Sequence, residues 1–433
     1  MTIAKYILTD AINNNNKFWE YEISGNTITY RWGRVGTTGQ SKTEISSSPE
    51  STAQSKANSK VKKGYVKLDV VSNVVSPTTN QTSVDKQIIQ NEAIKQFCPD
   101  GTDPVLMTLV NRLVETNRHE IYKSTGGKMD VDITTGIVST PVGVVTKDTV
   151  NQARILFDKM VPFIVANKLD DQSYIENLNN YLMKIPQKVG SSRGWHKSFL
   201  ANNNDIDKQL TLLDQLESSV DLALSRQKSA ISSSVDNKQV PTLFNSKVTV
   251  CTDQKVIDDI TKLFFSTLQQ QHVSSKLKPI RVYEVCIDTM NDSYSNYGAK
   301  LHNQELLWHG TRVFNILSIL KNGLIIPPVR GGTYSIAGRM FGNGVYFANS
   351  SSKSLNYSFG YWDGGPKDNN CFMFLCDVAL GDYYTPKSSS ESLPKAGFHS
   401  TWAKRNYSGV QNDEIIVYQT NQCNIKYLIE FGV

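Results

Sequence analysis

Apolar and polar residues alternate differently in three stretches of this chain. In the first stretch, apolar side chains recur at every second position on both sides of Gly25-Asn26, namely at Tyr21, Ile23, Ile28, Tyr30 and Trp32. A period of two interrupted by a two-residue connection that contains glycine is typical of a β-hairpin. The first stretch is therefore predicted to be a small β-rich module.

The middle stretch changes to the period of an α-helix. Asp103 followed by Pro104 is typical of a helix start, and the next apolar residues fall at the i, i+3, i+4 and i+7 positions, which are Leu106, Leu109, Val110 and Leu113. Thr146 is expected to cap a second helix, whose stripe is Val150, Ala153, Phe157 and Met160. A third stripe contains Ile206, Leu210, Leu213, Val220 and Leu224. The pattern predicts an all-α helical bundle.

The last stretch is rich in Tyr, Phe, Val and Gly, and has strand-like runs at residues 281–287, 372–378 and 415–418. Helices are expected at about residues 256–270 and 313–322. This part is predicted to be mainly β, with few helices.

Polar segments without periodicity separate the three stretches, and we interpret residues 76–88 and 227–241 as linkers. The predicted domains are then 1–75, 89–226 and 242–433, and the fold class is multidomain α+β. A length of 433 residues agrees with this division, since domains average about 150 residues.

Composition excludes several classes of protein. With 39% apolar and 9% aromatic residues, the chain is not disordered as a whole. No apolar run approaches the ~20 residues that span a bilayer, and the start lacks the long apolar stretch of a secretory signal, so we expect an intracellular protein without a membrane partner. The six cysteines are scattered without a CxxC pair, which disfavours a zinc finger or a disulfide framework.

The net charge of +6 is concentrated near the start of the chain. Residues 1–70 contain ten basic and six acidic side chains, a local net charge of +4. On charge alone, a polyanionic partner and a well-solvated lysine-rich face are both consistent with this excess.

The candidate chemistry lies mainly between residues 307 and 357. No dinucleotide-binding G-x-G-x-x-G follows a strand and no P-loop occurs. Instead, LLWHGTR contains His309 and Gly310, and GNGVYFA contains Tyr346 in a glycine-rich context. A single histidine or tyrosine of this kind is more often structural than catalytic, so the combination matters more than either residue.

These motifs, in this order, resemble the poly(ADP-ribose) polymerases, a family of the ADP-ribosyltransferase superfamily with a His, Tyr, Glu signature. The matching residues are His309 in WHGTR, Tyr346 in GNGVYFA and Glu414 in NDEIIVYQ. The resemblance implies that NAD⁺ is the substrate and that no metal is needed. It further implies the NAD⁺-binding residues His309, Gly310, Thr311, Ser318, Tyr346, Ala348, Ser354 and Tyr357.

Elementary chemistry agrees with these roles. Cleavage of the nicotinamide–ribose bond passes through an oxocarbenium-like state, which negative charge stabilises. Glu414 is expected to supply that charge, and His309 to donate a hydrogen bond to a ribose hydroxyl. Gly310 and Ser354 would hold the carboxamide. Tyr346 and Tyr357 would sandwich the cationic ring.

The resemblance extends to the rest of the chain. YRWGRVG is similar to the WGR module of DNA-dependent family members, which implies that Trp32, Arg34, Arg31 and Lys42 contact the nicks or ends of damaged DNA. Residues 89–226 resemble the family's helical regulatory domain, which restrains the NAD⁺ cleft until DNA is bound.

Together these motifs predict a DNA-break-activated protein ADP-ribosyltransferase that elongates poly(ADP-ribose) in the nucleus. The expected acceptors are other proteins and the chain itself, with an accessory protein that completes the acceptor site. The sequence departs from the polymerising pattern at Ile325 and Arg339 and in the short segment 384–414. Transfer of a single unit therefore stays an alternative, as does a catalytically silent DNA-binding scaffold.

Overall fold

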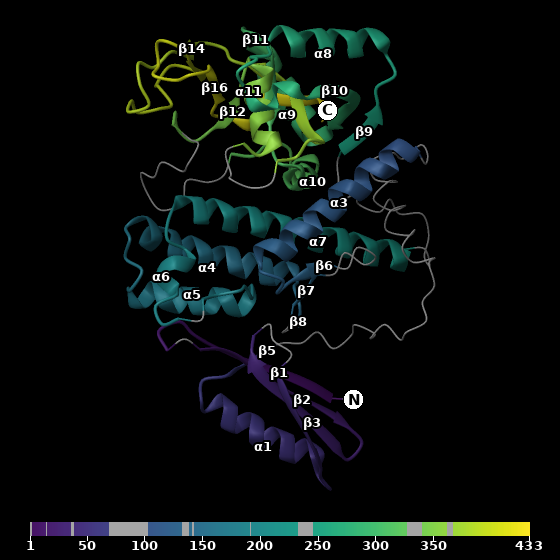
Figure 1. Ribbon diagram of the computed structural model, residues 1–433, viewed down its shortest axis with the longest axis vertical. Helices are drawn as coiled ribbons and strands as arrows, with labels where there is room; N and C mark the ends of the chain where they lie inside the picture. The colour runs from purple at the N-terminus through teal and green to yellow at the C-terminus, as the bar shows by residue number, and fades with distance from the viewer. Residues whose placement is uncertain are drawn as a thin grey trace. The chain divides into compact units, whose positions relative to one another are not determined.

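The computed structural model describes residues 2–13, 15–35, 39–68, 103–131, 138–140, 143–190, 192–232, 246–326, 340–361 and 367–433 (Figure 1). The predicted linker 76–88 and Arg339 lie outside these residues. Contacts divide the chain into two compact units, which are described separately. The first unit combines the N-terminal sheet with most of the helical region. This division into two units does not test the predicted division into three domains, which stays a prediction.

The first unit begins with an antiparallel sheet in the order β4-β3-β2-β1-β5. Its strands are β1 (Thr2–Asp10), β2 (Asn15–Ser24), β3 (Thr27–Arg34), β4 (Gln40–Ile45) and β5 (Val66–Leu68). The predicted hairpin is confirmed, because β2 and β3 pair around Gly25, whose φ is 57°. Helix α1 (Pro49–Val61) was not predicted, since apart from Pro49 its buried residues are only Ala53 and Ala57 and form no large apolar stripe.

The helical region supplies the rest of the first unit. It contains the end of α3 (Pro104–Ser124) from Arg118, then α4 (Lys147–Val165), α5 (Gln172–Lys184) and α6 (His196–Phe199), and α7 (Asn203–Ser232) as far as Leu224. Thr146 caps α4 as predicted, because its side chain accepts a 3.2 Å hydrogen bond from the Thr149 N–H. The predicted apolar stripe of α4 shares one core with Ile206, Leu210, Leu213 and Val220 of the predicted α7 stripe, and the side chain of Leu224 lies outside the described part of the chain.

Two details of the helical prediction are corrected. The region is not all-α, because a small sheet of β6 (Asp130–Val131), β7 (Val138–Thr140) and β8 (Gly143–Val144) follows α3. These strands are two or three residues long, too short for a recognisable period. Helix α7 continues to Ser232 and so enters the predicted linker 227–241.

The N-terminal sheet packs on the helical region within this unit. Met183 of α5 lies against a small apolar cluster of Ile7, Phe18 and Val35. The backbone N–H of Ala11 donates a 3.0 Å hydrogen bond to Asn179 Oδ1. Apolar and polar contacts therefore both join β1 and its neighbours to α5.

The second unit is built on two sheets, in the orders β11-β13-β17-β10-β9 and β12-β16-β15-β14. The strands are β9 (Ser246–Val250), β10 (Lys278–Ile287), β11 (Gln304–Gly310), β12 (Val345–Phe347), β13 (Cys371–Ala379), β14 (Tyr383–Tyr384), β15 (Ser400–Ala403), β16 (Glu414–Val417) and β17 (Cys423–Gly432). Three of them confirm the predicted runs at 281–287, 372–378 and 415–418.

Helices flank these two sheets. They are α8 (Gln254–Ser266), α9 (Asp288–Asn296), α10 (Val313–Asn322) and α11 (Ser351–Phe359), with short 3₁₀ turns η1 (Val273–Lys276), η2 (Gly298–Lys300) and η3 (Thr420–Gln422). The bounds of α10 agree with the prediction, whereas α8 ends at Ser266 rather than near residue 270.

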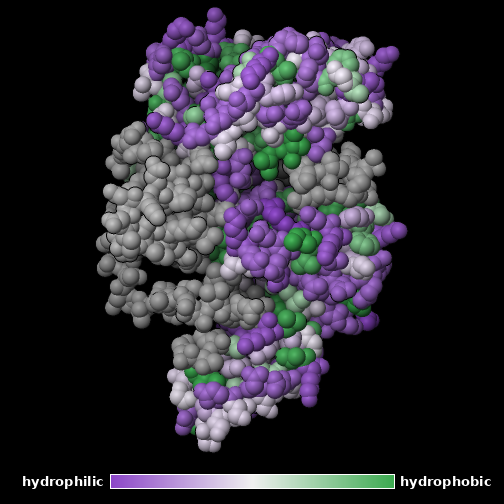
Figure 2. Space-filling view, turned by 180° about the vertical axis from the view of Figure 1, so that it is seen from behind, coloured by the Kyte–Doolittle hydropathy of each residue, from purple (hydrophilic) through white to green (hydrophobic). Residues whose placement is uncertain are grey.

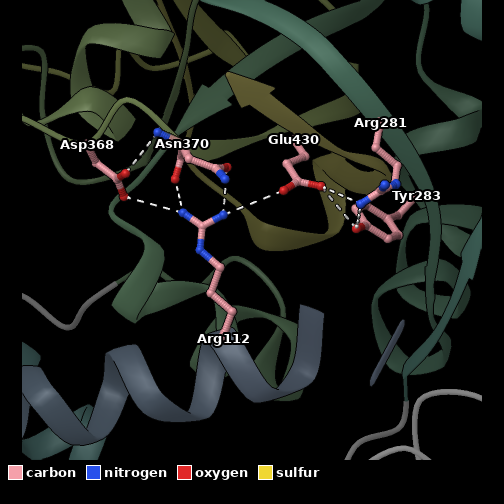
Figure 3. Close-up of polar contacts among 6 residues, drawn as sticks. All are labelled: Arg112, Arg281, Tyr283, Asp368, Asn370 and Glu430. Atoms are coloured by element: carbon pink, nitrogen blue, oxygen red, sulfur yellow. Dashed lines mark hydrogen bonds and ion pairs between the residues drawn. The ribbon is translucent and has the colours of Figure 1, made fainter. Parts of the chain in front are cut away.

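The start of α3, up to Asn117, groups with this second unit. Figure 3 shows how Arg112 binds there: it donates to the backbone oxygen of Asn370 and, at 2.6 Å, to Asn370 Oδ1. It also lies 3.6 Å from Glu430 and 3.7 Å from Asp368. Glu430, on β17, is buried and accepts further hydrogen bonds from Arg281 and Tyr283.

Hydrophilic residues predominate on the described part of the face in Figure 2, and hydrophobic residues form small separate groups. Among the described helices, none is long and apolar enough to cross a membrane.

Candidate active site

The end of strand β11 places His309 where the two sheets of the second unit meet. The neighbouring residue, Trp308, exchanges two 3.0 Å backbone hydrogen bonds with Ala348, just beyond β12. His309 itself is half-buried, and its Nδ1 lies 2.9 Å from the backbone oxygen of Tyr346. Since a carbonyl oxygen can only accept, Nδ1 carries the proton.

The protonation of His309 reverses one expectation from the sequence. Burial lowers the pKa of the imidazole below its ordinary value, which favours the neutral form. With the proton on Nδ1, the remaining nitrogen Nε2 has a lone pair and accepts a hydrogen bond. His309 would therefore accept from a ribose hydroxyl, where the sequence analysis expected it to donate.

Gly310 is held against helix α11 too closely for any side chain. A Cβ atom at this position would lie 1.7 Å from the backbone oxygen of Ser354. Two further contacts join β11 to α11: Ser354 Oγ donates to Trp308 O at 3.1 Å, and the Thr311 N–H donates to Ser358 Oγ at 3.1 Å. Four of the predicted NAD⁺-binding residues, His309, Gly310, Thr311 and Ser354, are thus brought together.

Tyr346 and Glu414 lie on one face of the smaller sheet. Tyr346 pairs with Ile416 of β16, and Glu414 is two residues before Ile416 along the same strand. Side chains two apart in a strand point to the same face. The Tyr346 hydroxyl donates to Gly342 O at 2.8 Å and accepts from the Phe341 N–H at 3.0 Å, which fixes the ring.

Glu414 is paired with a lysine that the sequence analysis did not include among the site residues. Lys353 Nζ, on α11, lies 2.7 Å from Glu414 Oε2 and also donates to the backbone oxygen of Asp413 at 2.7 Å. Lys353 is 6% exposed, and burial lowers the pKa of its ammonium although the Glu414 charge raises it. The motif KSLNY could have indicated Lys353, because Lys353 lies one helical turn before Tyr357, which is a predicted NAD⁺-binding residue.

Tyr357 lies close enough to Glu414 to respond to its charge. Burial, and then the Glu414 carboxylate, raise the pKa of Tyr357 to about 12. Its phenol therefore stays protonated at neutral pH, and the face of its ring can attract a cationic ligand.

The remaining predicted NAD⁺-binding residues are placed less directly. Ala348 is buried, and its backbone N–H and C=O both bind Trp308. Ser318 lies on α10, where its Oγ accepts from Asn322 at 3.5 Å; no hydrogen bond found among the described residues joins it to His309, Tyr346 or Glu414. Ile325, which departs from the polymerising pattern, is 51% exposed.

A cavity of about 440 Å³ opens beside the start of β16. It is lined by Gln271, His272, Val273, Asn356, Tyr361, Arg405, Asn406, Val410, Gln411 and Asn412. Asn412, two residues before Glu414, contacts His272 Nε2 through its side-chain amide at 3.4 Å. Asn412 thus links the cavity lining to the segment that precedes Glu414, and Glu414 itself is not a lining residue. Within the described residues no group of three or more His, Cys, Asp and Glu side chains could hold a metal ion.

Three of the four predicted nucleic-acid contacts lie on one face of the sheet, and the fourth does not. Trp32 and Arg34 are two apart in β3, and Lys42 of β4 pairs with Tyr30 on the same face. Arg31 points to the opposite face. Arg31 Nε is 2.5 Å from Glu20, which already neutralises it. Arg34 donates a 3.0 Å hydrogen bond to the backbone oxygen of Gly190 in the same unit, and Lys42 is exposed on β4.

A different basic cluster is present on this sheet. Lys60 of α1 lies near enough to Lys17 and Lys63 for their charges to lower its pKa, after the larger effect of burial. Its ammonium lies 5.7 Å from the ring centre of Trp19 and 5.4 Å from that of Tyr65. Sequence alone could not join Lys17 to Lys60, which are far apart along the chain.

Two protein families match this sequence. Residues 5–70 match the WGR domain, and residues 255–409 match the poly(ADP-ribose) polymerase catalytic domain, so Glu414 lies just beyond the matched range.

Curated proteins are similar over part or nearly all of the chain. Poly [ADP-ribose] polymerase 1 of Oryza sativa subsp. japonica is 33% identical over 42% of this chain and 20% of its own length. Protein mono-ADP-ribosyltransferase PARP3 of Homo sapiens is 24% identical over 98% of this chain and 86% of its own length. Poly [ADP-ribose] polymerase 1 of Gallus gallus is 24% identical over 98% of this chain and 44% of its own length. The chain thus spans less than half of the two polymerases and most of the human mono-transferase.

Proposed function

Because this chain carries a WGR domain and a poly(ADP-ribose) polymerase catalytic domain, we propose that it is a protein ADP-ribosyltransferase that cleaves NAD⁺. The observation that carries this proposal is the convergence of His309, Tyr346 and Glu414. The Tyr346 backbone binds His309, and its side chain shares a sheet face with Glu414.

In the proposed mechanism, the chain binds NAD⁺ with the nicotinamide ring between Tyr346 and Tyr357. Gly310 allows α11 to lie against the β11 backbone, and the lone pairs of Ser354 Oγ on that helix can accept from the carboxamide N–H. As the glycosidic bond lengthens, positive charge develops on the ribose and the Glu414 carboxylate stabilises it. Nicotinamide leaves with the bonding electron pair, and an acceptor oxygen attacks the same carbon.

The His309 imidazole would orient the ribose in this mechanism. Its Nε2 lone pair accepts a ribose hydroxyl hydrogen bond, while the Nδ1–H bond to Tyr346 O fixes the ring plane. Glu414 would also accept a hydroxyl hydrogen bond and polarise the attacking group. A hydroxyl acceptor would lose its proton to the Glu414 carboxylate and through it to water, while nicotinamide leaves as a neutral molecule.

We further propose that broken DNA stimulates the activity and that the product is poly(ADP-ribose). The WGR match supports a nucleic-acid partner, and the carboxylate of Glu414 supports elongation, since it can polarise a ribose hydroxyl acceptor. The acceptors would be proteins, including the chain itself. The cavity beside Asn412 offers one approach for an acceptor or for an accessory protein. A nuclear location follows from the expected DNA substrate.

Single-unit transfer is the second candidate. The human relative that aligns with 98% of this chain is named a mono-ADP-ribosyltransferase, and Ile325 departs from the polymerising pattern. A scaffold that binds DNA without chemistry is the third, and the grouping of His309, Tyr346 and Glu414 argues against it.

The test is incubation of the full chain with NAD⁺ labelled in the adenylate, with and without nicked duplex DNA. Label on protein that increases with DNA supports the proposal, and label that never grows beyond one unit on a denaturing gel supports single-unit transfer. Tight DNA binding without nicotinamide release would support the scaffold. Glu414→Gln should suppress labelling, and Glu305→Gln, at an exposed position of β11, is the matched control.

A further inference from the structure

The carboxylate of Asp413, immediately before Glu414, accepts three hydrogen bonds. Its Oδ2 accepts from Trp402 Nε1 at 2.8 Å and from Asn349 Nδ2 at 3.0 Å. Its Oδ1 accepts from the Arg405 backbone N–H at 2.8 Å. Hydrogen bonds to an ionised acceptor are about twice as strong as those between neutral groups. Asp413 is therefore fixed by three donors.

These donors come from three different segments around Glu414. Trp402 lies on β15, Arg405 follows that strand, and Asn349 lies between β12 and α11. The Asp413 carboxylate thus ties the strand that contains Glu414 to the strand that contains Tyr346 and to the start of α11.

The backbone of Asp413 also fixes the partner of Glu414. Its carbonyl oxygen accepts from Lys353 Nζ at 2.7 Å, and the same nitrogen lies 2.7 Å from Glu414 Oε2. Lys353 is thereby held between the Asp413 carbonyl and the Glu414 carboxylate. The position of the carboxylate expected to act on the ribose depends on both contacts.

We propose that Asp413 is a positioning residue for the Lys353–Glu414 pair, with the Trp402 indole N–H as one of its fixed donors. The inference rests on the proposed function of Glu414. Consecutive residues of an extended chain point to opposite sides, so Glu414 shares a sheet face with Tyr346 and Asp413 does not. Asp413 therefore acts through its neighbours. The hydrogen bonds of Asp413 restrict the movement of the Glu414 side chain, and Asp413 itself does not bind NAD⁺.

Asp413→Asn tests this role with little change of shape. A carboxylate has two acceptor oxygens and an amide has one. In Asp413→Asn the NH₂ group would therefore point at one of the donors that now bind Asp413, and that hydrogen bond would be lost. Misplacement by about 1 Å can reduce a rate on the order of 10²-fold. We expect Asp413→Asn to lower kcat for NAD⁺ cleavage by about that factor while KM for NAD⁺ changes little. Trp402→Phe keeps a ring and removes one donor, so its kcat should fall less.

The experiment measures kcat and KM for nicotinamide release with the full chain and nicked DNA. Asp259→Asn is the matched control, because Asp259 is exposed on α8 and pairs with Lys255 at the surface. Lower kcat at unchanged KM in both Asp413→Asn and Trp402→Phe supports the inference. If Asp413→Asn does not fold, Trp402→Phe decides alone.

Two results would overturn the inference: a wild-type kcat in the folded variants, or a rise in KM with kcat unchanged. Glu414→Gln is measured in parallel to separate the two proposals. If Glu414→Gln abolishes cleavage while the Asp413 and Trp402 variants keep the wild-type kcat, the positioning role fails and the proposed function stands. If Glu414→Gln is itself fully active, the proposed function of Glu414 fails.

Discussion

Lys353 and Glu414 form a buried ion pair, with 2.7 Å between Nζ and Oε2 and with 8% and 19% of their side chains exposed. The two residues are far apart in the sequence and lie on α11 and β16. Water screens such a pair weakly, so each charge depends strongly on the other.

Lys353→Met should therefore destabilise the chain and alter the site. Removing one partner of a buried pair costs about 3–5 kcal/mol in unfolding free energy, because the other charge stays buried. Urea unfolding of the variant measures this loss. The double variant Lys353→Met, Glu414→Gln should regain part of it, and an equal or greater loss in the double variant would contradict the pairing.

His309 should stay neutral below its ordinary pKa of 6.5, because burial lowers the pKa in the folded chain. Below 6.5 the unfolded chain binds a proton that the folded chain does not, so the contribution of His309 to stability decreases as pH falls through the lowered pKa. NMR titration of the ring and urea unfolding at several pH values measure both effects. Orientation of the ribose by His309 should persist at pH 6.5, whereas a ring that titrates above that value would refute the neutral form.

The basic cluster of Lys17, Lys60 and Lys63 should contribute to DNA affinity through phosphates. Replacing Lys63 with Gln should reduce the slope of log affinity against log salt by about one. Arg31→Gln is the matched comparison and should change the slope less, since Glu20 already pairs with Arg31. Fluorescence anisotropy with a nicked duplex measures both slopes, and a larger effect of Arg31 would exclude this assignment.

Trp32 offers a separate test of DNA stimulation. The side chain is half-buried and packs against the core of the N-terminal sheet. Trp32→Ala should weaken the DNA-stimulated NAD⁺ cleavage while the basal rate stays similar, because Trp32 belongs to the first unit and Glu414 to the second. Equal stimulation of the variant and the wild type would contradict a DNA-contact role.

Arg112 should hold the start of α3 on the second unit. Arg112→Ala leaves Glu430 with Arg281 and Tyr283, so we expect a modest loss of about 1 kcal/mol together with faster amide hydrogen exchange in α3. Glu115→Ala, an exposed position on the same helix, is the control. Unchanged exchange in Arg112→Ala would show that the contacts in Figure 3 do not retain the helix.

Local patterns in the sequence predicted the hairpin around Gly25, the capped start of α4 at Thr146 and the bounds of α10. These features depend on neighbouring residues, whose spacing and backbone preferences act within a few positions. Helix α1 and the short β6–β8 sheet were missed, because Ala53 and Ala57 form a weak stripe and strands of two or three residues have no period.

The sequence by itself determined the order of His309, Tyr346 and Glu414 and the type of chemistry that such residues support. Only the tertiary structure decided that Nδ1 of His309 holds the proton, that Lys353 pairs with Glu414, and that Asp413 joins three segments beside them. Likewise, it separated Arg31 from Trp32 and placed Lys60 near Lys17. The physical reason is that hydrogen bonds, burial and charge act through space, and the residues they join here lie tens of positions apart in the chain.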